Sequence, residues 1–327
     1  MTVTIGRREL LVALGGAAAA WPLAARAQPA MPVIGYLGGG PPVASWLAGL
    51  RKGLNDLGYA EGRNLAIEFR IAEQYDRLPA LVAELVRRRV ALIVTASNAD
   101  AAQAAKAATT TIPIVFTLGA DPVATGLVAS LARPGGNVTG VTFLGPELQP
   151  KRLELLRELL PQATTLAFLE NPTNSQAALN IRTLQAAARS VGVQIIVLRA
   201  STAGEIDAAF AGLVEQRVAG LLVDPDAFFV SRRDQLVALA ARHKIPSVYF
   251  APEFTAAGGL MSYSDNRIES FRKAGLYVGR ILKGEKPADL PVLQPTKFEF
   301  AINLKAAKAL GIEFPQSFHL RADTVIE

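Results

Sequence analysis

The chain has 327 residues with a formal net charge of +6, and half of its residues are hydrophobic, so it can bury a core and is not disordered. It contains no cysteine and two histidines, His243 and His319, which excludes disulfides, a cysteine nucleophile, and cysteine or multi-histidine metal sites. A chain of this length predicts two domains.

Residues 1–27 have the pattern of an export signal. The pair Arg7-Arg8 precedes an apolar stretch, residues 10–20, that is too short and too rich in glycine and alanine to span a bilayer. The site Ala25-Arg26-Ala27 follows, so we expect cleavage after Ala27 and a periplasmic mature chain without a lipid anchor. The twin-arginine and general secretory routes both stay open, as does a buried N-terminal helix.

Strands alternate with helices in the first half of the chain from residue 32 onward. The strand segments are continuously apolar, as expected for parallel strands that helices cover on both faces. The helices carry apolar residues at three- and four-residue spacing. The predicted order is strand 33–37, helix 45–57, strand 64–70, helix 78–88, strand 91–94, helix 100–108 and strand 112–116.

The second half repeats this order. The predicted elements are strand 165–169, helix 175–191, strand 194–198, helix 205–216, strand 220–223, helix 231–243 and strand 246–250. Three short sequences also recur in order, namely Leu57-Gly58 as Val191-Gly192, Val90-Ala91 as Val218-Ala219, and Ile112-Pro113 as Ile245-Pro246. Two copies of one open α/β unit would produce this pattern.

Three segments are predicted to cross between the two units: residues 137–150, 261–265 and 287–295. They surround a helix at 268–282 and precede a strand at 296–304, and no element is predicted in the last ten residues. Lobe 1 would comprise residues 28–142 and 263–286, and lobe 2 residues 143–262 and 287–327. The predicted fold class is α/β, with two doubly wound parallel-sheet lobes joined by a multi-strand hinge, and a ligand cleft between the carboxyl ends of the sheets.

Polar and aromatic side chains follow the strands at these carboxyl ends. The pairs Ser97-Asn98 and Asn174-Ser175 each precede a helix, where free backbone N–H groups suit a ligand carboxylate, with ordinary N-capping as the alternative. Trp46 and Phe250 could form an apolar wall or pack in the core. The predicted ligand-binding residues are Gly39, Trp46, Ser97, Asn98, Asp121, Asn174, Ser175, Asp224, Phe250 and Glu253.

The sequence shows no complete catalytic motif. Gly-x-Ser-x-Gly and P-loop sequences are absent, and the glycine run 38–40 is followed by proline rather than a helix entry. Asp224 and Asp226 could act as an acid–base pair or bind an ammonium group, and without a third partner we favour binding. We therefore predict no catalytic residue, no metal and no cofactor. Arginines at 87–89 and 232–233 are read as solvated helix surfaces, so nucleic-acid binding is not predicted.

A set of motifs spans nearly the whole predicted mature chain. They are Gly58-Tyr59, Gly62-Arg63-Asn64, Ile112-Pro113-Ile114-Val115-Phe116, Asp121-Pro122, Gly126-Leu127-Val128, Pro134-Gly135-Gly136-Asn137-Val138-Thr139-Gly140, Ile281-Leu282-Lys283-Gly284-Glu285-Lys286-Pro287 and Ile302-Asn303-Leu304-Lys305 with Ala307-Lys308. As a set, they resemble the periplasmic substrate-binding proteins of ABC transporters, in the group that includes the tryptophan-binding lipoproteins. The resemblance implies a type I periplasmic-binding-protein fold that closes on a solute and delivers it to a membrane permease with its ATPase, without changing it. It places pocket loops at Ser97-Asn98-Ala99, Asp121, Asn174-Ser175 and Asp224.

Two of these loops depart from the tryptophan-binding subgroup. Ser97-Asn98-Ala99 stands where Thr-Pro is common, and Pro225 stands where Asn is common, which argues against tryptophan as the ligand. The leading prediction is the solute-binding component of an ABC importer, which closes on an amino acid or another small carboxylate and associates with the membrane only transiently, through the permease. The alternatives are a sensor that presents its closed form to a membrane receptor, and a secreted enzyme that uses Asp224 and Asp226.

Overall fold

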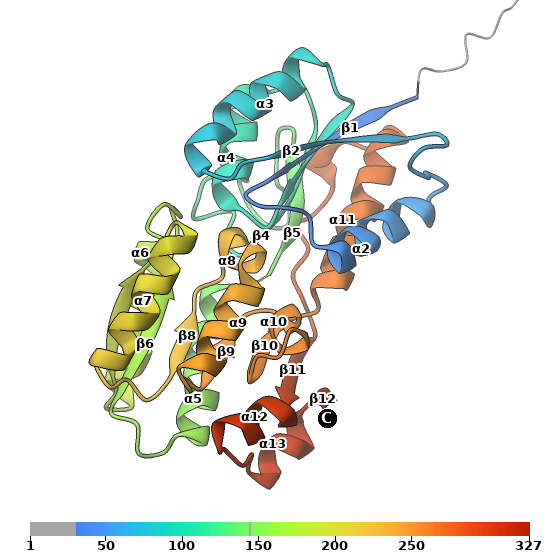
Figure 1. Ribbon diagram of the computed structural model, residues 1–327. Coiled ribbons are helices and arrows are strands. Elements are labelled where there is room, and N and C mark those ends of the chain that lie inside the picture. Colours follow the sequence, from blue (N-terminus) through green and yellow to red (C-terminus); the bar gives the residue numbers. More distant parts are fainter. Residues whose placement is uncertain (1–30, 144) are drawn as a thin grey trace, which may run out of the picture. The chain divides into compact units, whose positions relative to one another are not determined.

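The computed structural model describes residues 31–143 and 145–327, of which residues 32–327 form one compact unit. The predicted export signal, residues 1–27, lies outside the described residues. Among the helices that are described, none is long and apolar enough to cross a membrane. The compact unit contains two sheets with helices on both faces, which confirms the predicted α/β class (Figure 1).

The first sheet has five parallel strands in the order β2-β1-β3-β4-β5. They are β1 (Val33–Gly38), β2 (Ala66–Ile71), β3 (Leu92–Ala96), β4 (Ile114–Leu118) and β5 (Val138–Thr142). Helices α2 (Ala44–Asn55) and α11 (Arg267–Leu282) pack on one face, and α3 (Leu78–Arg87) and α4 (Ala99–Ala108) pack on the other. A short 3₁₀ turn, η1 (Tyr75–Arg77), precedes α3. Strands β3, β4 and β5 are buried at every position because both faces are covered.

Helices α2 and α11 come from distant parts of the chain and approach each other through glycines. A Cβ at Gly275 would overlap the carbonyl oxygen of Leu50, and a Cβ at Gly53 would overlap the carbonyl oxygen of Arg272. Only residues without a side chain permit so close a backbone approach. These glycines therefore allow α11 to pack closely against α2 on the first sheet.

The second sheet has seven strands in the order β12-β11-β10-β9-β8-β6-β7, and only the β10–β11 pair is antiparallel among the described strands. The strands are β6 (Thr165–Glu170), β7 (Gln194–Arg199), β8 (Leu221–Val223), β9 (Ser247–Tyr249), β10 (Met261–Asp265), β11 (Phe298–Asn303) and β12 (Thr324–Ile326). One face packs against α5 (Gln149–Leu159), α6 (Ala177–Ser190), α12 (Leu304–Leu310) and α13 (Gln316–Arg321). The other packs against α7 (Ala203–Glu215), α8 (Ala227–Ser231), α9 (Arg233–Arg242) and α10 (Pro252–Ala256).

The chain crosses between the lobes three times. The crossings follow β5 through η2 (Pro146–Leu148), join β10 to α11, and run from Leu293 to β11. The segment predicted to contain the first crossing, residues 137–150, begins with a full strand, because Val138–Thr142 pairs with β4, and the crossing follows this strand. The segment around η3 (Pro287–Asp289) stays with lobe 1, where the Thr139 hydroxyl donates to the Leu290 carbonyl at 2.6 Å. The predicted boundary at residue 286 thus precedes the last contact with the first sheet.

Charged groups are buried at the hinge. The Nε of Arg267 donates to Asp265 at 2.7 Å, and its guanidinium lies 3.9 Å from the centre of the Phe143 ring. Arg152 of α5 is fully buried and donates to the Tyr263 carbonyl at 2.9 Å, and burial lowers its pKa to about 9. Buried charges are tolerated only with partners, so these contacts fix the geometry of the crossings.

Candidate functional site

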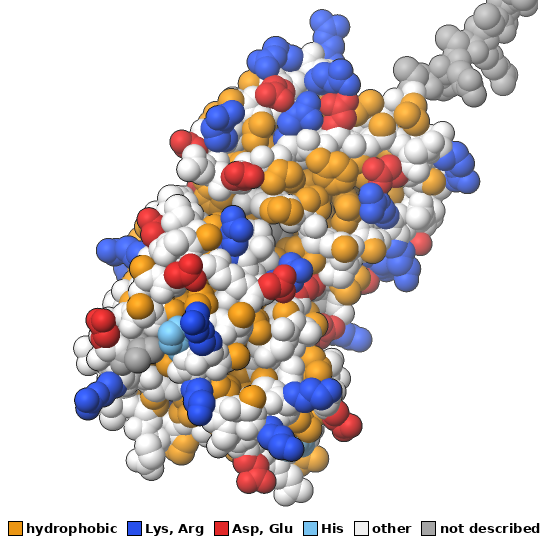
Figure 2. Space-filling model, viewed as in Figure 1, with side chains coloured by type: hydrophobic (Ala, Val, Ile, Leu, Met, Phe, Trp, Pro, Cys, Tyr) orange, Lys and Arg blue, Asp and Glu red, His pale blue; other side chains and the backbone are white. Residues whose placement is uncertain are grey.

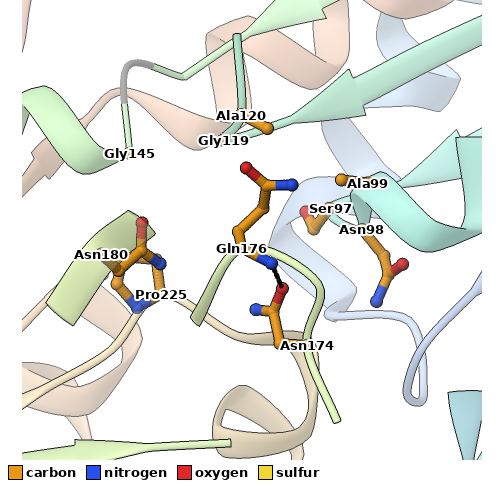
Figure 3. Close-up of a pocket in the computed structure, with 10 residues that line it drawn as sticks. All are labelled: Ser97, Asn98, Ala99, Gly119, Ala120, Gly145, Asn174, Gln176, Asn180 and Pro225. Carbon is orange, nitrogen blue, oxygen red and sulfur yellow. Dashed lines mark hydrogen bonds between the residues drawn. The ribbon is translucent and has the colours of Figure 1, made fainter. Parts of the chain in front are cut away.

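A small polar cavity of about 30 Å³ lies between the carboxyl ends of the two sheets. Ser97, Asn98 and Ala99 of lobe 1 face Asn174 and Gln176 of lobe 2 across it (Figure 3). The other lining residues are Gly119, Ala120, Gly145, Asn180 and Pro225.

The lobe 1 wall is the strand-to-helix turn between β3 and α4. Ser97 has a positive φ of 53° and is held there by its N–H, which donates to the Thr117 hydroxyl at 3.1 Å. Asn98 caps α4 by accepting from the N–H of Ala101 at 2.7 Å. The N-terminus of α4 thus lies at the cavity. Its free backbone N–H groups would stabilise a negatively charged ligand group there. The buried Ser97 hydroxyl has no hydrogen-bond partner within residues 31–143 and 145–327.

The lobe 2 wall is backed by two buried carboxylates. The Asn180 side chain donates to Asp224 at 2.9 Å, and the Asn174 side chain donates to Asp226 at 2.8 Å. Gln149 also donates to Asp224, at 3.2 Å. Burial raises the pKa of the Asp224 carboxyl well above its usual range and raises that of Asp226 as well. A cation in the cavity would stabilise both ionised forms.

Three acceptor atoms around Asp224 have no partner in the described part of the chain. They are the Oδ1 of Asn180, the Oδ2 of Asp224 and the Oε1 of Gln149, and all are buried. Unsatisfied buried acceptors cost free energy unless a donor reaches them. The lobe 2 wall therefore suits a ligand with several N–H donors, and the lobe 1 wall suits an anionic group.

A small apolar compartment of about 20 Å³ adjoins the polar cavity, and the two share Ser97. Tyr36, Val43 and Trp46 of lobe 1 and Val230 of lobe 2 line it. Gly40 and Pro41 connect this compartment to a larger outer cleft between the lobes. The two linings place polar groups beside an apolar surface.

Direct contacts join the lobes beside these cavities. The Tyr75 hydroxyl donates to the Asp226 carboxylate, 3.0 Å from each oxygen. The Trp46 indole N–H donates to Glu253 at 2.6 Å. The lobes are therefore in contact around the site rather than separated by an open cleft.

Three of the predicted binding residues, Ser97, Asn98 and Asn174, line the polar cavity, and Trp46 lines the apolar compartment. Asp224 does not line the cavity, but it accepts a hydrogen bond from Asn180, which does. The other five predicted positions lie elsewhere: Gly39 in the outer cleft, Glu253 in the contact between the lobes, and Asp121, Ser175 and Phe250 outside both cavities.

The three residues that lie outside both cavities have these surroundings. Asp121 is exposed and accepts from the N–H groups of Val123 and Ala124, so its carboxylate closes a turn. Ser175 is also exposed. Phe250 is buried in the core against Phe254, with ring centres 5.2 Å apart.

Residue-type reasoning at strand ends missed Asn180, Gln176 and Tyr75. Asn180 lies inside helix α6, and its signal in the sequence is a polar residue at helical spacing from the buried Ala177 and Leu184. Tyr75 lies four residues after the end of β2, and nothing in the sequence around it predicts a role at the site. Its role depends on the approach of the other lobe.

A family model described as ABC transporter substrate binding protein matches residues 38–326. The chain belongs to this family. The predicted resemblance is thereby confirmed, and the family is one of binding proteins rather than enzymes.

The relatives extend this result. A tyrosine-binding protein of Clostridioides difficile (strain R20291) is 30% identical over 267 residues, covering 81% of this chain and 76% of the relative. A solved structure from Streptococcus pneumonia, an ABC domain in complex with L-Trp, is 27% identical with a TM-score of 0.80, covering 90% of this chain and 99% of that chain. The ligand-free, open structure of a Clostridium difficile substrate-binding protein with adhesive properties has the same identity and coverage but a TM-score of 0.62.

These two solved structures differ from this chain equally in sequence but not in shape. At equal identity and coverage, the lower TM-score against the open structure indicates that the lobes here lie closer to the arrangement in the L-Trp complex. The direct contacts of Tyr75 and Trp46 across the cleft agree with this arrangement.

The surface carries charges of both signs. On the face shown in Figure 2, Lys and Arg side chains are interspersed with Asp and Glu side chains.

Proposed function

We propose that this chain is the extracytoplasmic binding component of an ABC importer and that its ligand is an α-amino acid with an aromatic or large apolar side chain. The pattern of residues 1–27 supports export, and family membership supports delivery to a permease with its ATPase. The ligand would be released unchanged.

The ligand class is inferred from the two cavity walls, because one offers hydrogen-bond acceptors and the other offers donors. Unpartnered acceptors of Asn180 and Asp224 lie on the lobe 2 side, and the Ser97 hydroxyl with the α4 N-terminus lies on the lobe 1 side. An α-amino acid presents both an ammonium group and a carboxylate. Its side chain would occupy the compartment of Tyr36 and Trp46.

The relatives support the same class. One is a tyrosine-binding protein, and another was solved with L-Trp. The substitutions in this chain at Ser97-Asn98-Ala99 and Pro225 fall on the cavity lining, so they bear on which amino acid fits. We propose L-tyrosine or L-phenylalanine in preference to L-tryptophan.

Calorimetric titration of the mature chain tests this proposal. L-tyrosine should bind, whereas tyramine, which lacks the carboxylate, and 3-(4-hydroxyphenyl)propionate, which lacks the ammonium group, should each bind at least about 100-fold more weakly. Mass spectrometry of the released ligand should show unchanged L-tyrosine. Equal binding of the propionate, or no binding of L-tyrosine, L-phenylalanine and L-tryptophan alike, would contradict the proposed ligand class.

A further inference from the structure

Two carboxylates of lobe 2 accept hydrogen bonds from side chains of lobe 1. Glu253, in the first turn of α10, accepts from the Trp46 indole N–H at 2.6 Å and from the Ser45 hydroxyl at 2.9 Å. Asp226, at the start of α8, accepts from the Tyr75 hydroxyl at 3.0 Å. We call these two contacts the Trp46–Glu253 contact and the Tyr75–Asp226 contact.

One contact includes a residue of the ligand cavities, and the other is one hydrogen bond away from such a residue. Trp46 lines the apolar compartment and stacks on Phe271 of α11, with ring centres 5.5 Å apart. Asp226 also accepts from Asn174, which lines the polar cavity. A ligand that orders Trp46 and Asn174 therefore orders a member of the Trp46–Glu253 contact and a partner of Asp226 in the Tyr75–Asp226 contact.

The contacts are largely excluded from water. Tyr75, Asp226 and Trp46 are 9%, 4% and 4% exposed. A charge-assisted hydrogen bond in such surroundings is stronger than one in water, and opening the lobes replaces it with hydration. The contacts thus favour the closed arrangement without touching the ligand head group.

We infer that Glu253 and Asp226 are positioning residues that hold the lobes closed through Trp46 and Tyr75 and thereby set the rate of ligand release. The inference rests on the proposed function for its ligand. Release requires the lobes to separate, so loss of either contact lowers the barrier to opening. Association is affected less, because the open form receives the ligand before these contacts form.

The decisive variant is Tyr75→Phe, which removes one hydroxyl and leaves Asp226 with its donors from Asn171, Asn174 and the Phe228 N–H. Its matched control is Tyr277→Phe. The Tyr277 hydroxyl is likewise bonded, to the Pro291 carbonyl at 2.6 Å, but within lobe 1. Glu253→Ala removes the second contact, and Glu253→Gln, which keeps an acceptor oxygen, should restore most of it.

The rates are read from the emission of Trp46, since the only other tryptophan, Trp21, lies in the predicted export signal. In stopped-flow mixing with L-tyrosine, Tyr75→Phe and Glu253→Ala should each raise the dissociation rate about tenfold and change the association rate by less than about threefold. Tyr277→Phe should match the parent. Parental dissociation rates in both Tyr75→Phe and Glu253→Ala would overturn the inference.

A readout without ligand separates this inference from the proposed function. Tyr75 donates to Asp226 and not to Glu253, so a red shift of Trp46 emission in Tyr75→Phe reports separation of the lobes. X-ray scattering should show a larger radius of gyration for the same variant. If the parent fails to bind L-tyrosine, these two measurements still decide the matter: a shift and expansion support the inference, and parental values overturn it.

Discussion

The Asp224→Asn variant tests the electrostatic basis of the site. Asp224 follows β8 directly, is fully buried, and uses one oxygen, Oδ1, to accept from Asn180 and Gln149. An asparagine of the same shape keeps this acceptor and places an amide N–H₂ where the unpartnered Oδ2 lies. The substitution thus removes the charge and one acceptor without removing packing.

The effect on binding follows from the charge that Asp224 carries when a ligand ammonium group stabilises its ionised form. Loss of a charge-assisted acceptor costs about 1.5–3 kcal/mol, which weakens ligand affinity roughly 10- to 100-fold. With L-tyrosine at a hundred times the parental Kd, the parent gains about 2.7 kcal/mol, whereas a variant that binds 100-fold more weakly gains only about 0.4 kcal/mol. Thermal unfolding with and without L-tyrosine measures this difference.

The effect on the free protein has the opposite sign. Because the pKa of Asp224 is raised in the folded state, the folded protein holds a proton that the unfolded chain releases. Stability of the parent therefore falls as the pH rises from the ordinary aspartate pKa toward the raised one. Asp224→Asn removes the contribution of Asp224 to this slope, leaving that of Asp226, and should be at least as stable as the parent at neutral pH. Asp121→Asn, at the exposed turn, is the control and should bind like the parent.

An Asp224→Asn variant that unfolds at lower temperature yet keeps the parental ligand-induced shift would refute this reasoning. It would show that the carboxylate supports the fold and not the ligand. A parental response in Asp121→Asn, together with a lost response in Asp224→Asn, would support the placement of the site behind Asn180.

Three further substitutions test the hinge, the helix packing and the lobe 1 wall. Arg267→Ala leaves Asp265 buried without its cation and should lower the free energy of unfolding by about 3–5 kcal/mol in urea denaturation. Gly275→Ala forces a Cβ against the Leu50 carbonyl and should cost about 1–3 kcal/mol in the same assay, with ligand affinity unchanged. Asn98→Ala removes the cap of α4 for about 1 kcal/mol and should also weaken binding of L-tyrosine in calorimetry.

Two of these substitutions, Arg267→Ala and Asn98→Ala, have a matched control. Arg272→Ala breaks a partly exposed pair with Asp56 and should cost no more than about 1 kcal/mol. Asn266→Ala removes the cap of α11, outside the lining of both cavities, so it should lower stability without changing Kd. Equal losses for Arg267→Ala and Arg272→Ala, or equal Kd values for Asn98→Ala and the parent, would contradict the respective assignment.

Local patterns in the sequence predict the alternation of strands and helices, because apolar runs and three- to four-residue spacing are local properties of the chain. The sequence also located Ser97, Asn98 and Asn174, since the carboxyl ends of parallel strands meet at one edge and the residues that follow them share it. The last ten residues gave no prediction, although they include most of α13 and all of β12. Their strand is only three residues long and depends on pairing with β11.

Only the folded structure shows which polar groups line the cavity or bond to the residues that line it. Asp121 and Asp224 both follow strands, yet one carboxylate closes an exposed turn and the other is buried behind Asn180. The pairing of Tyr75 with Asp226 joins residues from different lobes and different sheets. Spacing along the chain carries no information about such contacts, because they arise only where two separately folded surfaces meet.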